Sequence, residues 1–90
     1  MTKYEKCEFA ISQGYDYNPE TGDITSRFGR VMISKTSDGY GRLTLYSNGK
    51  QIHLKSSHFG WYYSNGNIVQ HLNHNNGDKL DNRLINLSIR

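Results

Sequence analysis

The spacing of hydrophobic positions changes from segment to segment along the chain, and in the first segment it is that of a helix. Over residues 1–14 the apolar side chains are spaced three or four apart, at Tyr4, Cys7 and Ile11. Thr2 can cap the start of a helix, and Gly14 suits the left-handed residue that follows its end. We therefore expect a helix from Thr2 to Gln13, which is too short to be stable unless it docks on the rest of the chain.

Residues 15–55 carry the signals of strands and tight turns. Between Asn18 and Asp23, Pro19 presets a turn and Gly22 can take a positive φ, so a reversal between two short strands is expected. Apolar and β-branched residues from Ile24 to Ile33 predict further strands.

The clearest element is a hairpin within this β-rich region, because Asn48-Gly49 is a strong signal for a two-residue turn. That turn sets the register of the cross-strand pairs: Tyr46–Gln51, Leu45–Ile52, Thr44–His53, Leu43–Leu54 and Arg42–Lys55. One face then carries the aliphatic residues and belongs on the core. The other places Arg42 opposite Lys55, which costs stability unless an anion lies over the pair. A phosphate backbone and plain solvent both remain possible coverings for this face.

Residues 56–66 predict a second short helix and residues 67–90 a polar loop between two strands. Ser56 or Ser57 can cap the helix, and Asn65-Gly66 can end it in the left-handed conformation. Its apolar positions are Phe59, Tyr62 and Tyr63, and packing is the expected role of His58 and Trp61. The strand candidates are Ile68 to Leu72 and Leu84 to Ile89.

Composition narrows the class of protein. Ninety residues, of which 34% are hydrophobic, predict one small domain with a thin core. Cys7 is the only cysteine, which excludes an internal disulfide and a zinc ribbon of several cysteines. No apolar run approaches the length of a membrane span, and the first residues do not resemble a signal peptide. We expect a soluble cytoplasmic protein that does not enter a membrane.

Charge is distributed unevenly along the chain. Residues 1–23 have a net charge of −3 and residues 24–90 a net charge of +6. A basic body indicates a polyanionic partner such as DNA, or simply a basic solvated surface. If DNA binds, the candidate contacts are Arg42, His53 and Lys55 on the hairpin, with Lys79 and Arg83 in the polar loop.

The polar loop carries a resemblance to a known family. Residues 73–87 read NHNNGDKLDNRLINL, which is similar to the Asp-His-x-Asn-Gly-Asp-Lys-x-Asp-Asn-Arg-x-x-Asn-Leu signature of phage-type HNH homing endonucleases. Further matches follow the family order upstream: YNPETGDI at 17–24, DGY at 38–40 and NGK at 48–50. The resemblance covers residues 15–87 and implies a ββα-metal site.

The resemblance also implies roles for single residues. His74 matches the general base, which takes a proton from the water that attacks the scissile phosphate. A divalent ion, Mg²⁺ or Mn²⁺, would stabilise the developing charge. Asn86 matches the central asparagine, whose amide holds the histidine loop. Asn82 and Arg83 match a turn that fixes this loop, and Arg83 can contact phosphate.

Two features depart from the family pattern. The residue before the histidine is normally an Asp that ligates the metal, and here it is Asn73, a neutral and weaker ligand for a hard cation. The family motif also has a helix after the second strand, with a final His or Asn ligand, whereas this sequence ends at Arg90. His71 and His74 do not replace these ligands, because positions three apart on a strand point to opposite faces.

These observations predict an α+β fold of small antiparallel hairpins, two short helices and a C-terminal ββ remnant of the HNH motif without its final helix. Three functions remain open: a metal-dependent HNH endonuclease or nickase, a non-catalytic DNA-binding module on a degenerate HNH scaffold, and a small phage protein that binds and inhibits a host or defence protein.

Overall fold

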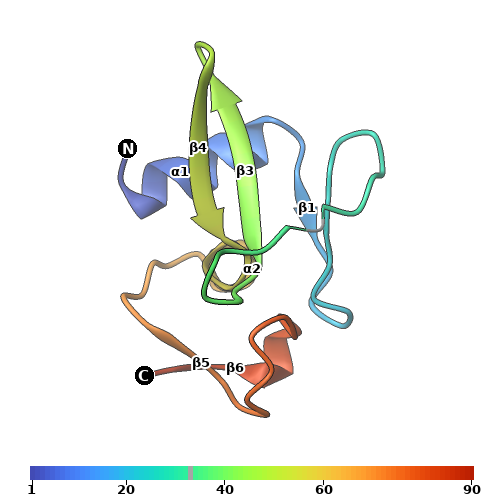
Figure 1. The fold of residues 1–90 in the computed structure, drawn as a ribbon, viewed down its shortest axis with the longest axis vertical. Coiled ribbons are helices and arrows are strands. Elements are labelled where there is room, and N and C mark those ends of the chain that lie inside the picture. Colours follow the sequence, from blue (N-terminus) through green and yellow to red (C-terminus); the bar gives the residue numbers. More distant parts are fainter. Residues whose placement is uncertain (33) are drawn as a thin grey trace.

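The computed structural model describes residues 1–32 and 34–90, and these residues form the α+β fold that the sequence predicts (Figure 1). The helices are α1 (Lys3–Ser12), α2 (Ser56–Asn65) and the 3-10 helix η1 (Leu84–Asn86). The strands form three separate antiparallel pairs: β1 (Asp16–Tyr17) with β2 (Ile24–Thr25), β3 (Arg42–Ser47) with β4 (Lys50–Lys55), and β5 (Leu72–His74) with β6 (Leu87–Ile89).

The predicted N-terminal helix is confirmed as α1, together with its cap. The Thr2 hydroxyl accepts a hydrogen bond from the Glu5 N–H at 3.2 Å, and the Glu5 carboxylate accepts one from the Thr2 N–H at 3.0 Å. These reciprocal bonds satisfy two donors that a helix start leaves open. Gly14 follows with a φ of 87°. The predicted apolar face is confirmed at Cys7, which is buried, and wrong at Tyr4 and Ile11, which are exposed. Ala10 is the second residue that α1 buries.

The hairpin of β3 and β4 has the predicted register at every pair from Arg42–Lys55 to Tyr46–Gln51. Asn48 and Gly49 form its turn with φ of 52° and 76°, the positive values that such a turn requires. Its inner face places Leu43, Leu45 and Leu54 in the core, with Ile52 packed against it.

The expected reversal between Asn18 and Asp23 is present and joins β1 to β2. The strands expected from Ile24 onward are shorter than predicted: β2 ends at Thr25, and Val31 adds an isolated bridge to Thr25. The end of that prediction, Ile33, lies outside the described residues.

Helix α2 differs from the prediction at its start and agrees at its end. No side chain caps its first turn, because Lys55 is the capping residue and both Ser56 and Ser57 already belong to the helix. Gly66 ends it in the left-handed conformation, as predicted. The strand expected over 68–72 begins only at Leu72, and the one expected over 84–89 begins with the turn of η1.

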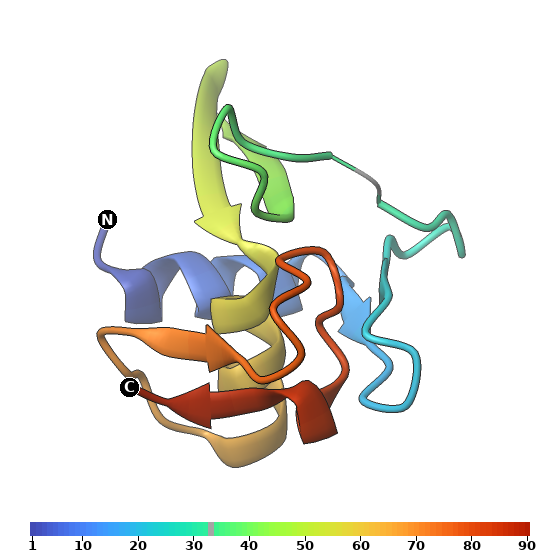
Figure 2. The same cartoon turned by 60° about the horizontal axis from the view of Figure 1, so that its bottom comes forward.

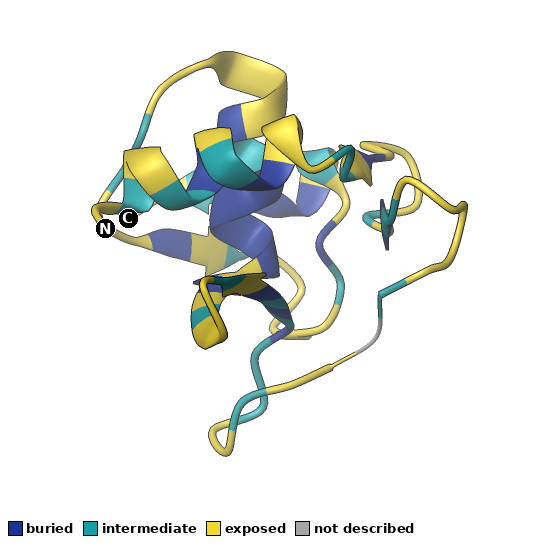
Figure 3. Cartoon of the chain, turned by 90° about the horizontal axis from the view of Figure 1, so that it is seen from above, coloured by how far each residue is buried: buried dark blue, intermediate teal, exposed yellow. Residues whose placement is uncertain are grey.

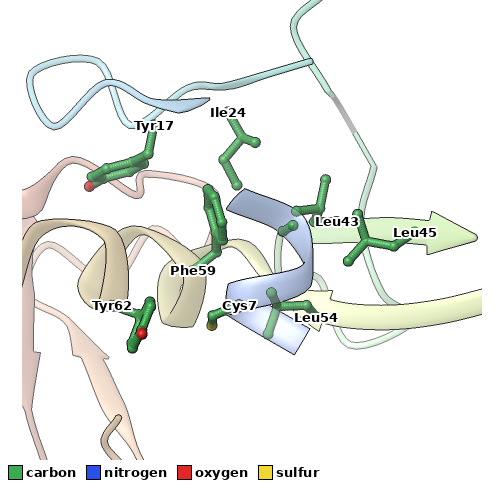
Figure 4. Packing of buried hydrophobic residues seen from close by; sticks show 9 residues of the cluster. Cys7, Tyr17, Ile24, Leu43, Leu45, Leu54, Phe59 and Tyr62 are labelled. Atoms are coloured by element: carbon green, nitrogen blue, oxygen red, sulfur yellow. The ribbon is translucent and has the colours of Figure 1, made fainter. Parts of the chain in front are cut away.

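Helix α2 is the centre of the molecule. In Figure 3 it lies at the middle of the chain and is largely buried, with the other elements around it. Helix α1 packs against both α2 and β4. Figure 4 shows Phe59 among the buried side chains of the cluster, whose labelled members are Cys7, Tyr17, Ile24, Leu43, Leu45, Leu54 and Tyr62.

One glycine allows β1 to approach this central helix. A Cβ on Gly60 would lie 2.5 Å from Cε1 of Tyr17, closer than real Cβ atoms come to other atoms. The absence of a side chain at Gly60 therefore lets the Tyr17 ring lie flat against α2. No helix in the described part of the chain is long and apolar enough to cross a membrane.

Candidate functional site

The candidate site is the C-terminal pair of strands and the polar loop that joins them. Figure 2 shows β5 and β6 side by side in front of α2, with the loop turning back beside the segment that precedes β3. Leu72 and Leu87 point inward and are buried, while Asn73 is exposed. The short strands thus hold their apolar residues against the molecule and present the polar ones at the surface.

His74 lies at the end of β5, opposite Leu87, and one hydrogen bond orients its ring. The Nε2 of His74 donates to Oδ1 of Asn82 over 2.8 Å. With the hydrogen on Nε2, Nδ1 keeps the lone pair through which a neutral imidazole accepts a proton. The ring is half-buried and its centroid lies 5.9 Å from that of Tyr40. The hydrogen bond to Asn82 thus favours one tautomer of the neutral imidazole.

Asn86 binds the two ends of the loop together. Its Nδ2 donates to the Asp81 carbonyl at 2.8 Å and to Asn76 Oδ1 at 3.0 Å, and its Oδ1 accepts the Asn76 N–H at 2.9 Å. Its backbone carbonyl accepts the Asn75 N–H at 2.8 Å. Asn86 is buried, so these bonds satisfy groups that water does not reach. The segment that carries Asn82, the partner of His74, is held in place by this one side chain.

The turn between β1 and β2 supports the same segment from the other side. The Tyr17 hydroxyl donates to the Asn82 carbonyl at 2.5 Å, and the Leu84 N–H donates to the Pro19 carbonyl at 2.9 Å. Burial, with a contribution from nearby Asp81, raises the pKa of Tyr17 to about 12, so its hydroxyl stays a donor. At Gly22, a Cβ would lie 2.6 Å from the Arg83 nitrogen, which shows how closely the two segments pack.

Arg83, a candidate phosphate contact, forms a two-pronged ion pair within the loop. Its Nε and Nη2 donate to the two carboxylate oxygens of Asp81 at 2.8 Å and 2.7 Å. The hydrogen bonds from Arg83 hold the pKa of the Asp81 carboxyl well below its usual range, and the pKa of Arg83 is raised in turn. The guanidinium therefore neutralises a loop carboxylate in this structure.

Two other candidate contacts, Lys55 and Lys79, meet on the ring of Tyr40. The ammonium of Lys55 lies 4.2 Å from the ring centroid and that of Lys79 lies 4.8 Å from it. Lys79 also donates to the Asp38 carbonyl at 2.9 Å. Since the same ring lies beside His74, two positive charges are brought to the edge of the site.

The remaining hairpin candidates are Arg42 and His53. Arg42 is opposite Lys55, as predicted, and its Nε is buried without a hydrogen-bond partner among the described residues. His53 shares a hydrogen bond of 3.3 Å with Thr44 through its Nδ1. Lys55 and Lys79 thus lie over the Tyr40 ring, which is beside His74. The Arg83 guanidinium is paired with Asp81 instead.

The acidic, histidine and cysteine side chains of the described residues do not gather into a divalent-ion site. Over residues 1–32 and 34–90, no group of three or more His, Cys, Asp or Glu side chains is placed to hold a metal ion. Asn73, at the position of the expected metal ligand, contributes only a neutral amide. His71 lies just before β5 and forms no such group with His74.

Two features of the site were missed in the sequence. Tyr40 lies in a matching tripeptide, but nothing local indicates that its ring lies between two lysines and next to a histidine 34 positions away. The bond between His74 and Asn82 was also not foreseen. Their common position in one polar loop is the signal that suggests a contact between them.

Comparison with known proteins identifies the fold. No protein-family model matches the chain, and no curated protein sequence matches it. Among solved structures, it is similar to the one described as "DNA binding and cleavage by the HNH homing endonuclease I-HmuI", with a TM-score of 0.62 and 25% sequence identity. The match covers 81% of this chain and 44% of the other, so the chain spans less than half the length of that endonuclease chain. The chain thus has the HNH-type fold of a homing endonuclease, as its motifs indicate.

Proposed function

We propose that this chain is a DNA-cleaving HNH module in which His74 is the general base of phosphodiester hydrolysis. The solved structure with the similar fold is described as binding and cleaving DNA. The observation that carries the proposal is the hydrogen bond from His74 Nε2 to Asn82 Oδ1, which leaves Nδ1 as a proton acceptor at the end of β5.

Each residue of the site has one role in the proposed reaction. Nδ1 of His74 takes a proton from a water molecule as the water oxygen bonds to phosphorus. The bond from phosphorus to the leaving oxygen breaks, and that oxygen keeps the bonding pair and takes up a proton from solvent. Asn82 fixes the orientation of the imidazole, and Asn86 fixes Asn82 by bracing the loop. Lys55 and Lys79 attract the phosphate to this side of the molecule.

The proposal is tested by nicking of supercoiled plasmid in Mg²⁺ or Mn²⁺. His74→Ala removes the base, and a positioned general base contributes about 10²–10⁴-fold to a rate. We expect nicking to fall by that amount, while Asn67→Ala, an exposed change outside the site, keeps the wild-type rate. Equal nicking by wild type and His74→Ala would show that the cleavage comes from a contaminant, and the proposed base would be abandoned.

A second function is favoured by Asn73, where the family has a metal-binding Asp. A module with this amide can bind DNA through its basic face without cleaving it. The two functions separate in the variant Asn73→Asp, which supplies the carboxylate. If wild type binds a labelled duplex but does not nick plasmid, and Asn73→Asp nicks it only with added Mg²⁺ or Mn²⁺, the binding module is the right description of the natural sequence.

A further inference from the structure

A cavity of about 290 Å³ opens beside the candidate site, between α1, the end of β4, the start of α2 and the residues around β5. Its size is at the lower end of the range for ligand sites. Most of its lining is basic or hydrogen-bonding, and among the described residues no Asp or Glu lines it. The charged and imidazole side chains of the wall are Lys3, Lys6, His53, Lys55, His58, His71 and Arg90.

Among the described residues, no lysine of the cavity forms an ion pair with a carboxylate, although a hydrogen bond from Thr36 and, more weakly, the charge of Lys55 lower the pKa of the Asp38 carboxyl. Arg83 is the only one of the eleven Lys and Arg residues that forms an ion pair in the described part of the chain. Lys3 and Lys6 instead donate to the backbone carbonyls of Gln70 and His53, each at 3.0 Å. An ammonium has three donors, so these bonds hold each group at the wall and leave donors and charge for an anion.

The start of α2 adds a second source of positive potential to the same cavity. Ser57, in the first turn of this ten-residue helix, lines the wall. The first turn has neither a side-chain cap nor an acidic residue. The Ser56 N–H already donates to the Gly41 carbonyl at 3.0 Å. The N–H groups that follow it in the first turn and the positive end of the helix dipole favour an anion, and here they act together with the lysines.

The cavity and the candidate site share two residues as neighbours. Lys55 and Tyr40 line it, and the Tyr40 ring also lies beside His74. The Lys55 ammonium lies over that ring, so its positive charge is close to both the cavity and the candidate site. An anion in the cavity is thus a near neighbour of whatever lies at His74.

We propose that this cavity is a backbone-phosphate subsite, which holds a phosphate of the DNA strand next to the one that faces His74. The inference rests on the proposed function, because it takes DNA as the ligand. Because Tyr40 and Lys55 border both the cavity and the site of His74, a polymer with repeated phosphates fits better than a free anion. Each internucleotide phosphate carries a negative charge that Lys3, Lys6 and the start of α2 can neutralise together.

The test is the salt dependence of DNA binding by the double variant Lys3→Gln/Lys6→Gln. Fluorescence anisotropy of a labelled duplex of about 20 base pairs gives the affinity over a salt series, whose log–log slope is about −0.9 per phosphate contact. We expect the slope to become shallower by about one, with about tenfold weaker binding at low salt. The matched control is Lys35→Gln/Lys50→Gln, which removes two lysines that do not line the cavity.

Amide NMR signals supply a second measurement, and the same spectra show whether the variant is folded. Titration of the wild-type chain with the duplex should shift the Ser57 and His58 N–H signals, and the double variant should lose these shifts. A variant with the wild-type slope and unchanged signals would overturn the subsite while leaving hydrolysis at His74 intact. Signals that move with inorganic phosphate but not with the duplex would also overturn it.

The subsite and the proposed hydrolysis can fail separately. If wild type and His74→Ala nick equally but the double variant loses affinity and the NMR shifts, the phosphate subsite stands and only the hydrolysis is abandoned.

Discussion

The core around α2 and the loop before β6 are stabilised by different forces. Phe59, Leu43 and Leu45 are fully or almost fully buried and meet other apolar side chains. The loop over 75–83 buries little apolar surface, and Leu80 is 53% exposed. Its structure comes from hydrogen bonds that converge on Asn86 and from the contact of Tyr17 with Asn82.

Because of this difference, the stability of the chain and the geometry of the candidate site depend on different residues. Burial is non-directional, so the core tolerates some change of shape but responds strongly to lost volume. Hydrogen bonds are directional, so they hold Asn82 and His74 in one arrangement. Their net contribution to the free energy of unfolding is modest. We therefore expect core substitutions to unfold the whole chain and loop substitutions to release the site alone.

Leu43→Ala is expected to have the largest effect on stability. Leu43 is completely buried in β3, and truncation of such a leucine costs about 3 kcal/mol of the free energy of unfolding through lost burial and the remaining cavity. Urea unfolding measures this loss. Thr44→Ala, on the outer face of the same strand, is the control and should cost much less. A loss below that of the control would mean that β3 is not part of the core.

Asn86→Ala tests the loop against the core. The change leaves the Asn76 N–H and the Asp81 carbonyl without their partner, which costs about 1–3 kcal/mol when such groups stay buried. Hydrogen exchange should become faster at the backbone N–H groups of the loop and remain slow in the β3–β4 hairpin. Equal acceleration in both regions would show that the loop and the core unfold as one unit. The loop could then not be released without unfolding the core.

His58 predicts acid sensitivity at the boundary of the core. Burial, aided by nearby Lys3, lowers the pKa of His58 to about 4. Because the unfolded chain takes up this proton near pH 6.5 and the folded chain only near pH 4, stability should be full above pH 6.5 and fall between these values. We expect a loss of about 1.5 kcal/mol, since water in the adjoining cavity solvates part of the charge.

The measurement is the difference in unfolding free energy between wild type and His58→Gln from pH 7 to pH 4. The difference should narrow as the pH falls, because only the wild type has this histidine to protonate. The exposed change Asn67→Ala, which removes no titratable group, should instead give a curve parallel to the wild type. If the difference in unfolding free energy between wild type and His58→Gln stayed constant with pH, burial would not lower the pKa of His58 as expected.

Local patterns were sufficient to predict the elements that stabilise themselves locally. The register of β3 with β4 followed from Asn48-Gly49 and from the alternation on both sides of it. The start of α1 followed from Thr2 and its cap. The buried face of α1 did not follow, because close packing against α2 and β4 selects Ala10 over the larger Ile11.

The site was only partly predictable because its contacts cross the chain. The family motif indicated His74 and Asn86, and the structure adds which atoms they bind. Tyr17 and Tyr40 reach the site from segments more than thirty residues away in sequence. The strand before His74 starts later than its apolar residues suggest, since β5 pairs with β6 only from Leu72 onward.

Arg83→Gln is expected to have the smallest effect on stability, although its ion pair has ideal two-pronged geometry. The pair is at the surface, where water and salt screen the attraction and ordering of the side chains offsets it. Asp81 keeps its hydrogen bond from Asn76, so the loop retains its internal connection. Thermal unfolding in low and high salt should give the wild-type midpoint within error. A decrease comparable to that of Asn86→Ala would mean that charge, as well as amide hydrogen bonding, holds the loop.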